Sequence, residues 1–313
     1  MTSQLGRVVL AGASGPIGRG LASSLRADGH EVRRLVRHSP PSLDEATWDP
    51  DRGVLSPDAL DGAAAVVNLA GRSIAGESLF GGRWTVRVRA EILDSRVRST
   101  RLIVETLNRL SARPAVLVSA SAIGYYGNRG DETLSETSTP GRGFLAEVTN
   151  AWEAEAMRAS ALGVRVVRTR FGLILARQGG TLDRLLPIFR LGLGGWLGSG
   201  RQWWSWIHLD DVIGAITMAI RTPALEGPVN VVGPAPVSNR AFTRALAAAL
   251  RRPAILPVPV FALRLALGGM ADEMVLSSQR VLPARLQAAG FAFRWPDLGP
   301  ALKDLAAPKA GRA

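Results

Sequence analysis

The sequence lacks cysteine altogether and is poor in two other ionisable residues. Tyrosine occurs only as Tyr125 and Tyr126, and lysine only as Lys303 and Lys309. Without cysteine, disulfides, thiolate metal sites and cysteine nucleophiles are excluded, and we predict no metal centre. No apolar run reaches the roughly 18 residues of a membrane span. The polar start, Met1–Gly6, does not resemble a signal peptide. These absences favour a cytoplasmic protein.

Negative charge is less abundant than positive charge. The 313 residues carry a net charge of +12 at pH 7, and almost all of the positive charge is arginine. The arginines are scattered, with no basic run of five or more and no interleaved aromatic ladder, so we expect no nucleic-acid partner. A small anionic cofactor or substrate is the partner that this charge favours. A homodimer is left open.

Alternation of apolar strands with amphipathic helices is the dominant pattern. It predicts an α/β fold: a doubly wound, Rossmann-like parallel sheet with ligands at the carboxyl ends of its strands. The predicted strands are Arg7–Ala11, Glu31–Val36, a short one near Thr47–Trp48, Ala63–Leu69, Ala115–Ser119, Val164–Arg168 and Val229–Val232. The predicted helices are Pro16–Asp28, Arg83–Leu110, Phe144–Leu162, Val212–Ile220 with Asp210 as its cap, Asn239–Leu250 opened by Ser238, Phe261–Leu267 and Pro283–Ala289.

We expect two domains and a tail. Residues 1–232 form the dinucleotide-binding domain, and the proline-rich stretch Pro253–Pro259 begins a smaller C-terminal module over 253–300. Residues 306–313 read as a flexible tail.

Three glycines follow the first strand at the spacing GxxGxxG. Gly12 allows a tight turn, Gly15 lets the backbone approach a pyrophosphate, and Gly18 lets the helix pack close to the strand. The helix start then offers free N–H groups to the anion. Ser14, Pro16 and Ile17 lie in the same turn. A purely structural glycine turn is the alternative.

Arg37 stands at the end of the second strand, where a dinucleotide fold meets the adenosine ribose. An arginine there pairs with a 2′-phosphate, so Arg37, with Arg34 or His38 as helpers, favours NADP(H) over NAD(H). A solvated strand-end arginine is the alternative. At the end of a later strand, Asn68, Leu69, Ala70 and Gly71 form a small-residue edge suited to close cofactor approach.

Several stretches together resemble the extended short-chain dehydrogenase/reductases, and more closely their atypical epimerase branch, SDR family 39U. They are Gly12–Gly18, Asn68–Gly71, Asp94–Val97, Ser119–Gly127, Trp152-Glu153, Leu191–Gly195, Gly198–Trp203, Trp206–Asp211 and Gln279–Pro283. The resemblance covers nearly the whole chain and implies a C-terminal module of the DUF1731 type. It implies NAD(P)-dependent epimerase, dehydratase or reductase chemistry on a small polar substrate, sugar-like or nucleotide-linked.

The resemblance also implies a catalytic Ser, Tyr and Lys, and here the sequence departs from it. Ser121 matches the serine, with Ser119 as second choice and as a cofactor contact. Leu145 and Thr149 fall at the Tyr and Lys places, and neither can perform that proton transfer. Tyr125 is the substitute proton donor that we favour. A packing role for Tyr125 is the alternative.

Weaker candidates complete the site. Glu147 and His208 are other ionisable groups near the cleft, each with a structural alternative. Arg201 and Trp203 offer a cation and a flat surface for a substrate. The missing Tyr and Lys leave a second function open, a cofactor-binding protein without turnover.

Overall fold

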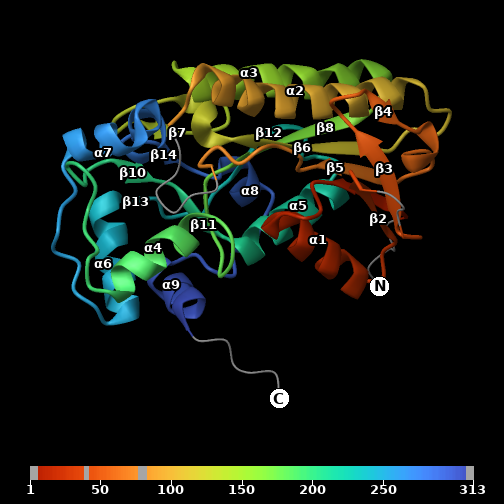
Figure 1. Ribbon diagram of the computed structural model, residues 1–313. Coiled ribbons are helices and arrows are strands. Elements are labelled where there is room, and N and C mark those ends of the chain that lie inside the picture. Colours follow the sequence, from red (N-terminus) through yellow and green to blue (C-terminus); the bar gives the residue numbers. More distant parts are fainter. Residues whose placement is uncertain (1–5, 39–41, 77–82, 308–313) are drawn as a thin grey trace.

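A parallel β-sheet is the centre of the molecule, seen in a computed structural model that describes residues 6–38, 42–76 and 83–307 (Figure 1). Its strand order is β12-β8-β6-β5-β1-β2-β3-β4, and only β4 runs antiparallel to its neighbour. These strands are β1 (Val8–Ala11), β2 (Val32–Val36), β3 (Glu45–Asp49), β4 (Val54–Leu55), β5 (Ala65–Asn68), β6 (Val116–Ala122), β8 (Arg165–Phe171) and β12 (Gly227–Val231). The Rossmann-like α/β prediction is confirmed.

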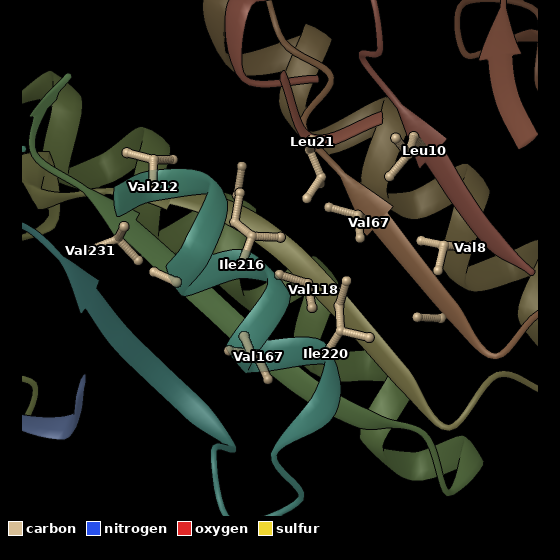
Figure 2. Packing of buried hydrophobic residues seen from close by; sticks show 14 of the residues in the cluster. Val8, Leu10, Leu21, Val67, Val118, Val167, Val212, Ile216, Ile220 and Val231 are labelled. Atoms are coloured by element: carbon tan, nitrogen blue, oxygen red, sulfur yellow. The ribbon is translucent and has the colours of Figure 1, made fainter. Parts of the chain in front are cut away.

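Helices cover both faces of the sheet. Alternate strand residues such as Val8, Leu10 and Val67 pack against α1 (Pro16–Ala27) and α5 (Leu209–Arg221) on one face. Figure 2 shows Leu21 of α1 beside Leu10 and Val67, and Ile216 of α5 beside Val118. The other face lies under α2 (Val86–Asn108) and α3 (Phe144–Met157), which appear above the sheet in Figure 1. Burial on both faces explains why the central strands are almost wholly apolar.

The remaining elements form the C-terminal side of the molecule. Three short two-stranded sheets join distant segments, and α9 packs against α6. The strands are β7 (Thr133–Leu134), β9 (Leu173–Leu175), β10 (Trp203–Trp204), β11 (Trp206–His208), β13 (Val237–Ser238) and β14 (Arg280–Val281), and the helices are α4 (Thr181–Arg190), α6 (Asn239–Leu250), α7 (Val260–Leu267), α8 (Ala284–Ala288) and α9 (Leu298–Ala306). All six of these strands are absent from the sequence prediction, because strands of two or three residues are too short to show a periodicity. The helices α4 and α9 are absent from it as well.

Two sequence predictions need correction. Asp210 does not cap α5. The helix begins at Leu209, and the imidazole of His208 accepts the Asp210 N–H at 3.1 Å, which places Asp210 in the first turn. The strand predicted to end at Ser119 continues to Ala122, because β6 pairs with β8 in unbroken register as far as Phe171. Ser121 therefore lies within the sheet.

Three helices predicted in the C-terminal part of the chain are confirmed. α7 and α8 form within one residue of their predicted limits, and the Ser238 hydroxyl accepts the Ala241 N–H at the start of α6. The predicted tail starts inside α9, and its residues 308–313 lie outside the described residues. Within the described ranges, none of the helices combines the length and the apolar character needed to cross a membrane.

Candidate functional site

The glycine turn after β1 is shaped by the strand next to it. Gly12 has a φ of +78°, and a Cβ there would lie 2.6 Å from the Leu69 carbonyl carbon and 2.8 Å from the Ala70 nitrogen. The Leu69 N–H donates to the Ala11 carbonyl at 2.9 Å, which holds the two loops together. Glycine is therefore required at position 12 by the protein's own backbone.

Gly15 differs, because neither its backbone angles nor its contacts with the described residues require a glycine. Its φ of −71° and ψ of 166° suit any residue, and a Cβ there would meet only the Gly12 carbonyl oxygen, at 3.6 Å. Gly15 precedes α1 and provides no side-chain cap, and among the described residues no side chain accepts the amides of Ile17 and Gly18. An uncapped helix start above open space fits a phosphate group of a dinucleotide.

The basic residues around β2 separate into paired and unpaired ones. Arg34 contacts Glu45 at 2.9 Å, and His38 contacts the same carboxylate at 3.4 Å. Arg37 is exposed and, over the part of the chain that the structure describes, has no ion-pair partner. A cavity of about 250 Å³ beside the glycine turn is lined by Ala13, Arg19, Ala22, Ser23, Arg26 and Arg34. Of the three residues considered for a 2′-phosphate, Arg37 is the one without an ion-pair partner among the described residues, and Arg34 is the one that lines this cavity.

The edge after β5 is built from the inside by Asn68. Its buried amide donates to the Thr100 hydroxyl at 2.9 Å and accepts the Ala70 N–H at 3.1 Å, so Asn68 shapes the edge with its side chain. Leu69 and Ala70 are half-buried, and Gly71 is exposed. Ser119 is enclosed in the sheet, where its hydroxyl donates to the Ala120 carbonyl at 3.3 Å.

Ser121 belongs to a buried charged network that the sequence analysis missed. Its hydroxyl donates to Glu153 at 2.7 Å, and Arg170 binds both oxygens of the same carboxylate at 2.7 and 2.9 Å. Arg168 adds a contact at 2.9 Å. Burial alone would lower the pKa of Arg170. The hydrogen bonds to Glu153 and its negative charge outweigh burial, and the pKa of Arg170 is raised. The sequence signal for this network was the presence of charged residues, Glu153 and Arg170, in a helix and a strand that were otherwise expected to be apolar on their buried sides.

Both tyrosines contact Arg170, and their rings also meet edge to face with centroids 5.2 Å apart. The Arg170 guanidinium carbon is 3.4 Å from the centre of the Tyr125 ring, a cation–π contact. The Tyr126 hydroxyl donates to Asn230 at 2.7 Å and accepts from Arg170 at 3.0 Å, and burial raises its pKa. The Tyr125 hydroxyl has no partner among the described residues. Tyr126 is thus structural, and Tyr125 carries the one uncommitted phenol.

The start of α3, where the resemblance expects tyrosine and lysine, is filled by other groups. Leu145 packs beside Gly124, and the Thr149 hydroxyl donates to the Leu145 carbonyl at 2.8 Å. Glu273 accepts the N–H groups of Phe144 and Leu145 at 3.0 and 2.8 Å. A small cavity of about 50 Å³ remains here, lined by Gly124, Gly127, Asn128, Arg142, Leu145, Ala146, Asp272, Glu273, Ser277 and Gln279.

The other sequence candidates lie apart from these groups. Arg201 is exposed, and the Trp203 indole donates to Asp131 at 2.8 Å while Arg280 covers its ring at 4.4 Å. Glu147 is exposed on α3, and His208 caps α5. Across residues 6–38, 42–76 and 83–307, no group of three or more His, Asp or Glu side chains is arranged to hold a metal ion.

Comparison with known proteins identifies the family. The model of the NAD dependent epimerase/dehydratase family matches residues 8–251, and a domain of unknown function, DUF1731, matches 258–305. The epimerase family protein Mb2239 of Mycobacterium bovis is 43% identical over 295 residues, which is 94% of this chain and 96% of that protein.

Two solved structures extend this result. The crystal structure of human epimerase family protein SDR39U1 (isoform 2) with NADPH is 33% identical, with a TM-score of 0.86 over 96% of this chain and 99% of that one. A nucleoside-diphosphate sugar epimerase from Corynebacterium glutamicum is 36% identical, with a TM-score of 0.78 over 96% of this chain and 57% of that one. This chain belongs to the NAD dependent epimerase/dehydratase family.

Proposed function

We propose that this protein binds NADP(H) in preference to NAD(H). The observation that carries the proposal is the unpaired Arg37 just past the end of β2, the strand that pairs with the one leading into the glycine turn. Arg34 and His38, in contrast, contact Glu45. The human relative was solved with NADPH, and its fold is close to this one. A guanidinium recognises a phosphate by paired hydrogen bonds, so Arg37 suits the 2′-phosphate that NAD(H) lacks.

Two segments would contact the pyrophosphate of the cofactor. The amides at the start of α1, within the turn Gly12–Gly18 that includes Ser14, Pro16 and Ile17, would hold the pyrophosphate. Leu69, Ala70 and Gly71 would border it at the end of β5. When bound, the nicotinamide supplies hydride-transfer chemistry.

We further propose that the reaction is a reduction or epimerisation of a small polar substrate, with a nucleotide-linked sugar as the first class to test. The name of the Corynebacterium relative supports that class. The Ser121 hydroxyl donates its hydrogen bond to Glu153, so its oxygen lone pairs would accept a hydrogen bond from a substrate hydroxyl. The free hydroxyl of Tyr125 is the proposed proton donor, and Arg201 and Trp203 are proposed substrate contacts.

A second function, cofactor binding without turnover, is favoured by a separate observation. Leu145 and Thr149 stand where proton transfer is expected, and the Thr149 hydroxyl is already bonded to its own helix. In this case NADP(H) would stabilise the fold or report the cofactor level.

Arg37→Asp tests the cofactor preference. We expect the Kd of NADPH to rise about 10- to 100-fold and that of NADH to change little, because a charge-assisted contact to the 2′-phosphate is worth about 1.5–3 kcal/mol. Arg34→Ala is the matched control, and it should leave the ratio of the two constants unchanged. Equal weakening of NADPH and NADH in Arg37→Asp would remove Arg37 from the 2′-phosphate.

Turnover is tested by mixing the NADPH-bound protein with a panel of carbonyl compounds and nucleotide sugars. Nicotinamide absorbance reports reduction, and product analysis of the sugars reports epimerisation. Activity lost in Tyr125→Phe with the NADPH Kd unchanged would support the enzyme proposal. Tight NADPH binding without turnover across the panel would support the second function.

A cytoplasmic location, a homodimer and the absence of nucleic-acid partners stay predictions, as do the two-domain limits. Light scattering on the purified chain measures the oligomeric state.

A further inference from the structure

Arg96 of α2 lies against the edge that follows β5. Its guanidinium carbon is 3.4 Å, and one of its terminal nitrogens 3.6 Å, from the place that a Cβ of Gly71 would take. On its other side the guanidinium faces the Trp152 ring, at 5.2 Å from the ring centre. The side chain is half-buried between the two.

Arg96 differs from Arg98 and Arg101 of the same helix in having no carboxylate partner among the described residues. Arg98 pairs with Asp94 at 3.1 Å, and Arg101 pairs with Glu155 at 2.6 Å. One terminal nitrogen of Arg96 donates to the Ile92 carbonyl of its own helix at 3.0 Å, and no acidic side chain in the described part of the chain reaches it. Burial lowers its pKa to about 10.

Such an arrangement is costly for the protein alone. A desolvated cation without a counter-charge opposes folding, whereas an apolar side chain at the same place beside Trp152 would not. Gly71 is exposed and has no side chain to cover the guanidinium, so the cation remains reachable from the carboxyl edge of the sheet. The geometry leaves hydrogen-bond donors of Arg96 for a group that is not part of the chain.

We propose that Arg96 binds a phosphate oxyanion of a ligand at the Gly71 edge. This proposal rests on the proposed function, because it assumes that the protein binds a nucleotide cofactor or a nucleotide-linked substrate. Two sources share this chemistry, the pyrophosphate of the cofactor and the diphosphate of a nucleotide-linked substrate. In either case the ligand supplies the negative charge that the fold withholds from Arg96.

Arg96→Met is the first variant to test, because methionine keeps an unbranched apolar stem beside Trp152 and removes the charge. Arg98→Met is the matched control on the exposed side of the same helix. NADPH is titrated into each protein, and inorganic pyrophosphate is then titrated into the NADPH-saturated protein as a probe of a second diphosphate site. Both titrations are followed by calorimetry.

Either of two results supports the proposal. A Kd of NADPH that rises tenfold or more in Arg96→Met, and not in Arg98→Met, assigns the cofactor pyrophosphate to Arg96. An unchanged NADPH Kd with a tenfold loss of pyrophosphate binding assigns the substrate diphosphate. If neither constant changes relative to Arg98→Met, the proposal is overturned.

Two further measurements keep the test decisive. If the wild-type protein binds no NADPH, the proposed cofactor function fails, and pyrophosphate titration of the free protein still reports on Arg96. If Arg96→Met does not fold, butanedione labelling of Arg96 in the wild-type protein is read by peptide mass spectrometry. Pyrophosphate should protect Arg96 from labelling at least fivefold, and equal labelling with and without it would contradict the proposal.

Discussion

The helices α1 and α3 start in the same way, but their first N–H groups have different acceptors. Both follow a glycine without a side-chain cap, Gly15 for α1 and Gly143 for α3. At α3 the Glu273 carboxylate, from far along the chain, accepts the first two amides. At α1 no described side chain takes that role.

We infer from this difference that the start of α1 is the proposed cofactor site and that the start of α3 has a structural role. A helix start needs acceptors, and where the protein supplies none while leaving open space, a ligand anion is the expected acceptor. Substitutions near α1 should therefore change cofactor affinity and spare stability. Substitutions near α3 should do the reverse.

Glu153→Ala should have the largest effect, and on stability. It leaves Arg170, which is 2% exposed, without its carboxylate, and an unpaired buried charge costs about 3–5 kcal/mol. Urea unfolding measures the loss. Glu155→Ala, whose arginine partners are exposed, is the control and should cost about 1 kcal/mol or less. A loss no larger in Glu153→Ala than in Glu155→Ala would show that the network does not stabilise this side of the sheet.

Gly15→Val should have the opposite profile. Its φ and ψ are ordinary and the protein leaves room for the side chain, so the free energy of unfolding should change by less than about 0.5 kcal/mol. The side chain would occupy the pyrophosphate path, and the NADPH Kd should rise about 100-fold or more, about 2.7 kcal/mol.

Calorimetric titration of Gly15→Val measures this loss, with Gly299→Val as the control. Gly299 lies in α9, and a Cβ there would meet no protein atom within 4 Å, whereas a Cβ at Gly15 makes one ordinary contact at 3.6 Å. Wild-type affinity in Gly15→Val would place the pyrophosphate elsewhere.

The α1 end could be predicted from the sequence because its determinants are local. Gly12, Gly15 and Gly18 lie within seven residues, and Arg37 ends the next strand. The sequence did not show that Arg34 and His38 are neutralised by Glu45, because that strand was predicted only around Thr47 and Trp48.

The α3 end could not be predicted for the converse reason. Glu153 meets Arg170 across 17 residues, and Glu273 meets Leu145 across 128. Each of these residues alone looks like an ordinary charged residue, and only the three-dimensional pairing gives it a role. That Leu145 and Thr149 stand at the places of an ionisable pair stays a prediction from the sequence.

Glu273→Ala should have a moderate effect, confined to the α3 end. It removes the acceptor from two amides at a helix start, which costs about 0.5–2 kcal/mol. Hydrogen exchange at Phe144 and Leu145 should speed up, while the NADPH Kd stays within about twofold. Asp272→Ala is the control, because its partner Arg264 is exposed and the pair should contribute little. Unchanged exchange at both amides would show that Glu273 does not cap α3.

The start of α5 adds a third case to the comparison of helix starts, and we expect the smallest effect on stability there. Here a side chain of the chain's own, His208, accepts the Asp210 N–H, and burial lowers its pKa below 6.5 even though Asp210, Asp304 and Asp211 face it. The unfolded state therefore binds the proton more readily, and stability is lost as pH falls from 6.5 toward the folded pKa. Burial raises the pKa of Asp211, so its contribution runs the other way, present at low pH and lost as pH rises through its folded pKa. Urea midpoints at pH 7.5 and 5.5 should fall less in His208→Asn, which keeps a capping acceptor, than in the wild type. An equal fall in both proteins would mean that His208 has the same pKa in the folded and unfolded states, so that its protonation plays no part in the pH dependence of stability.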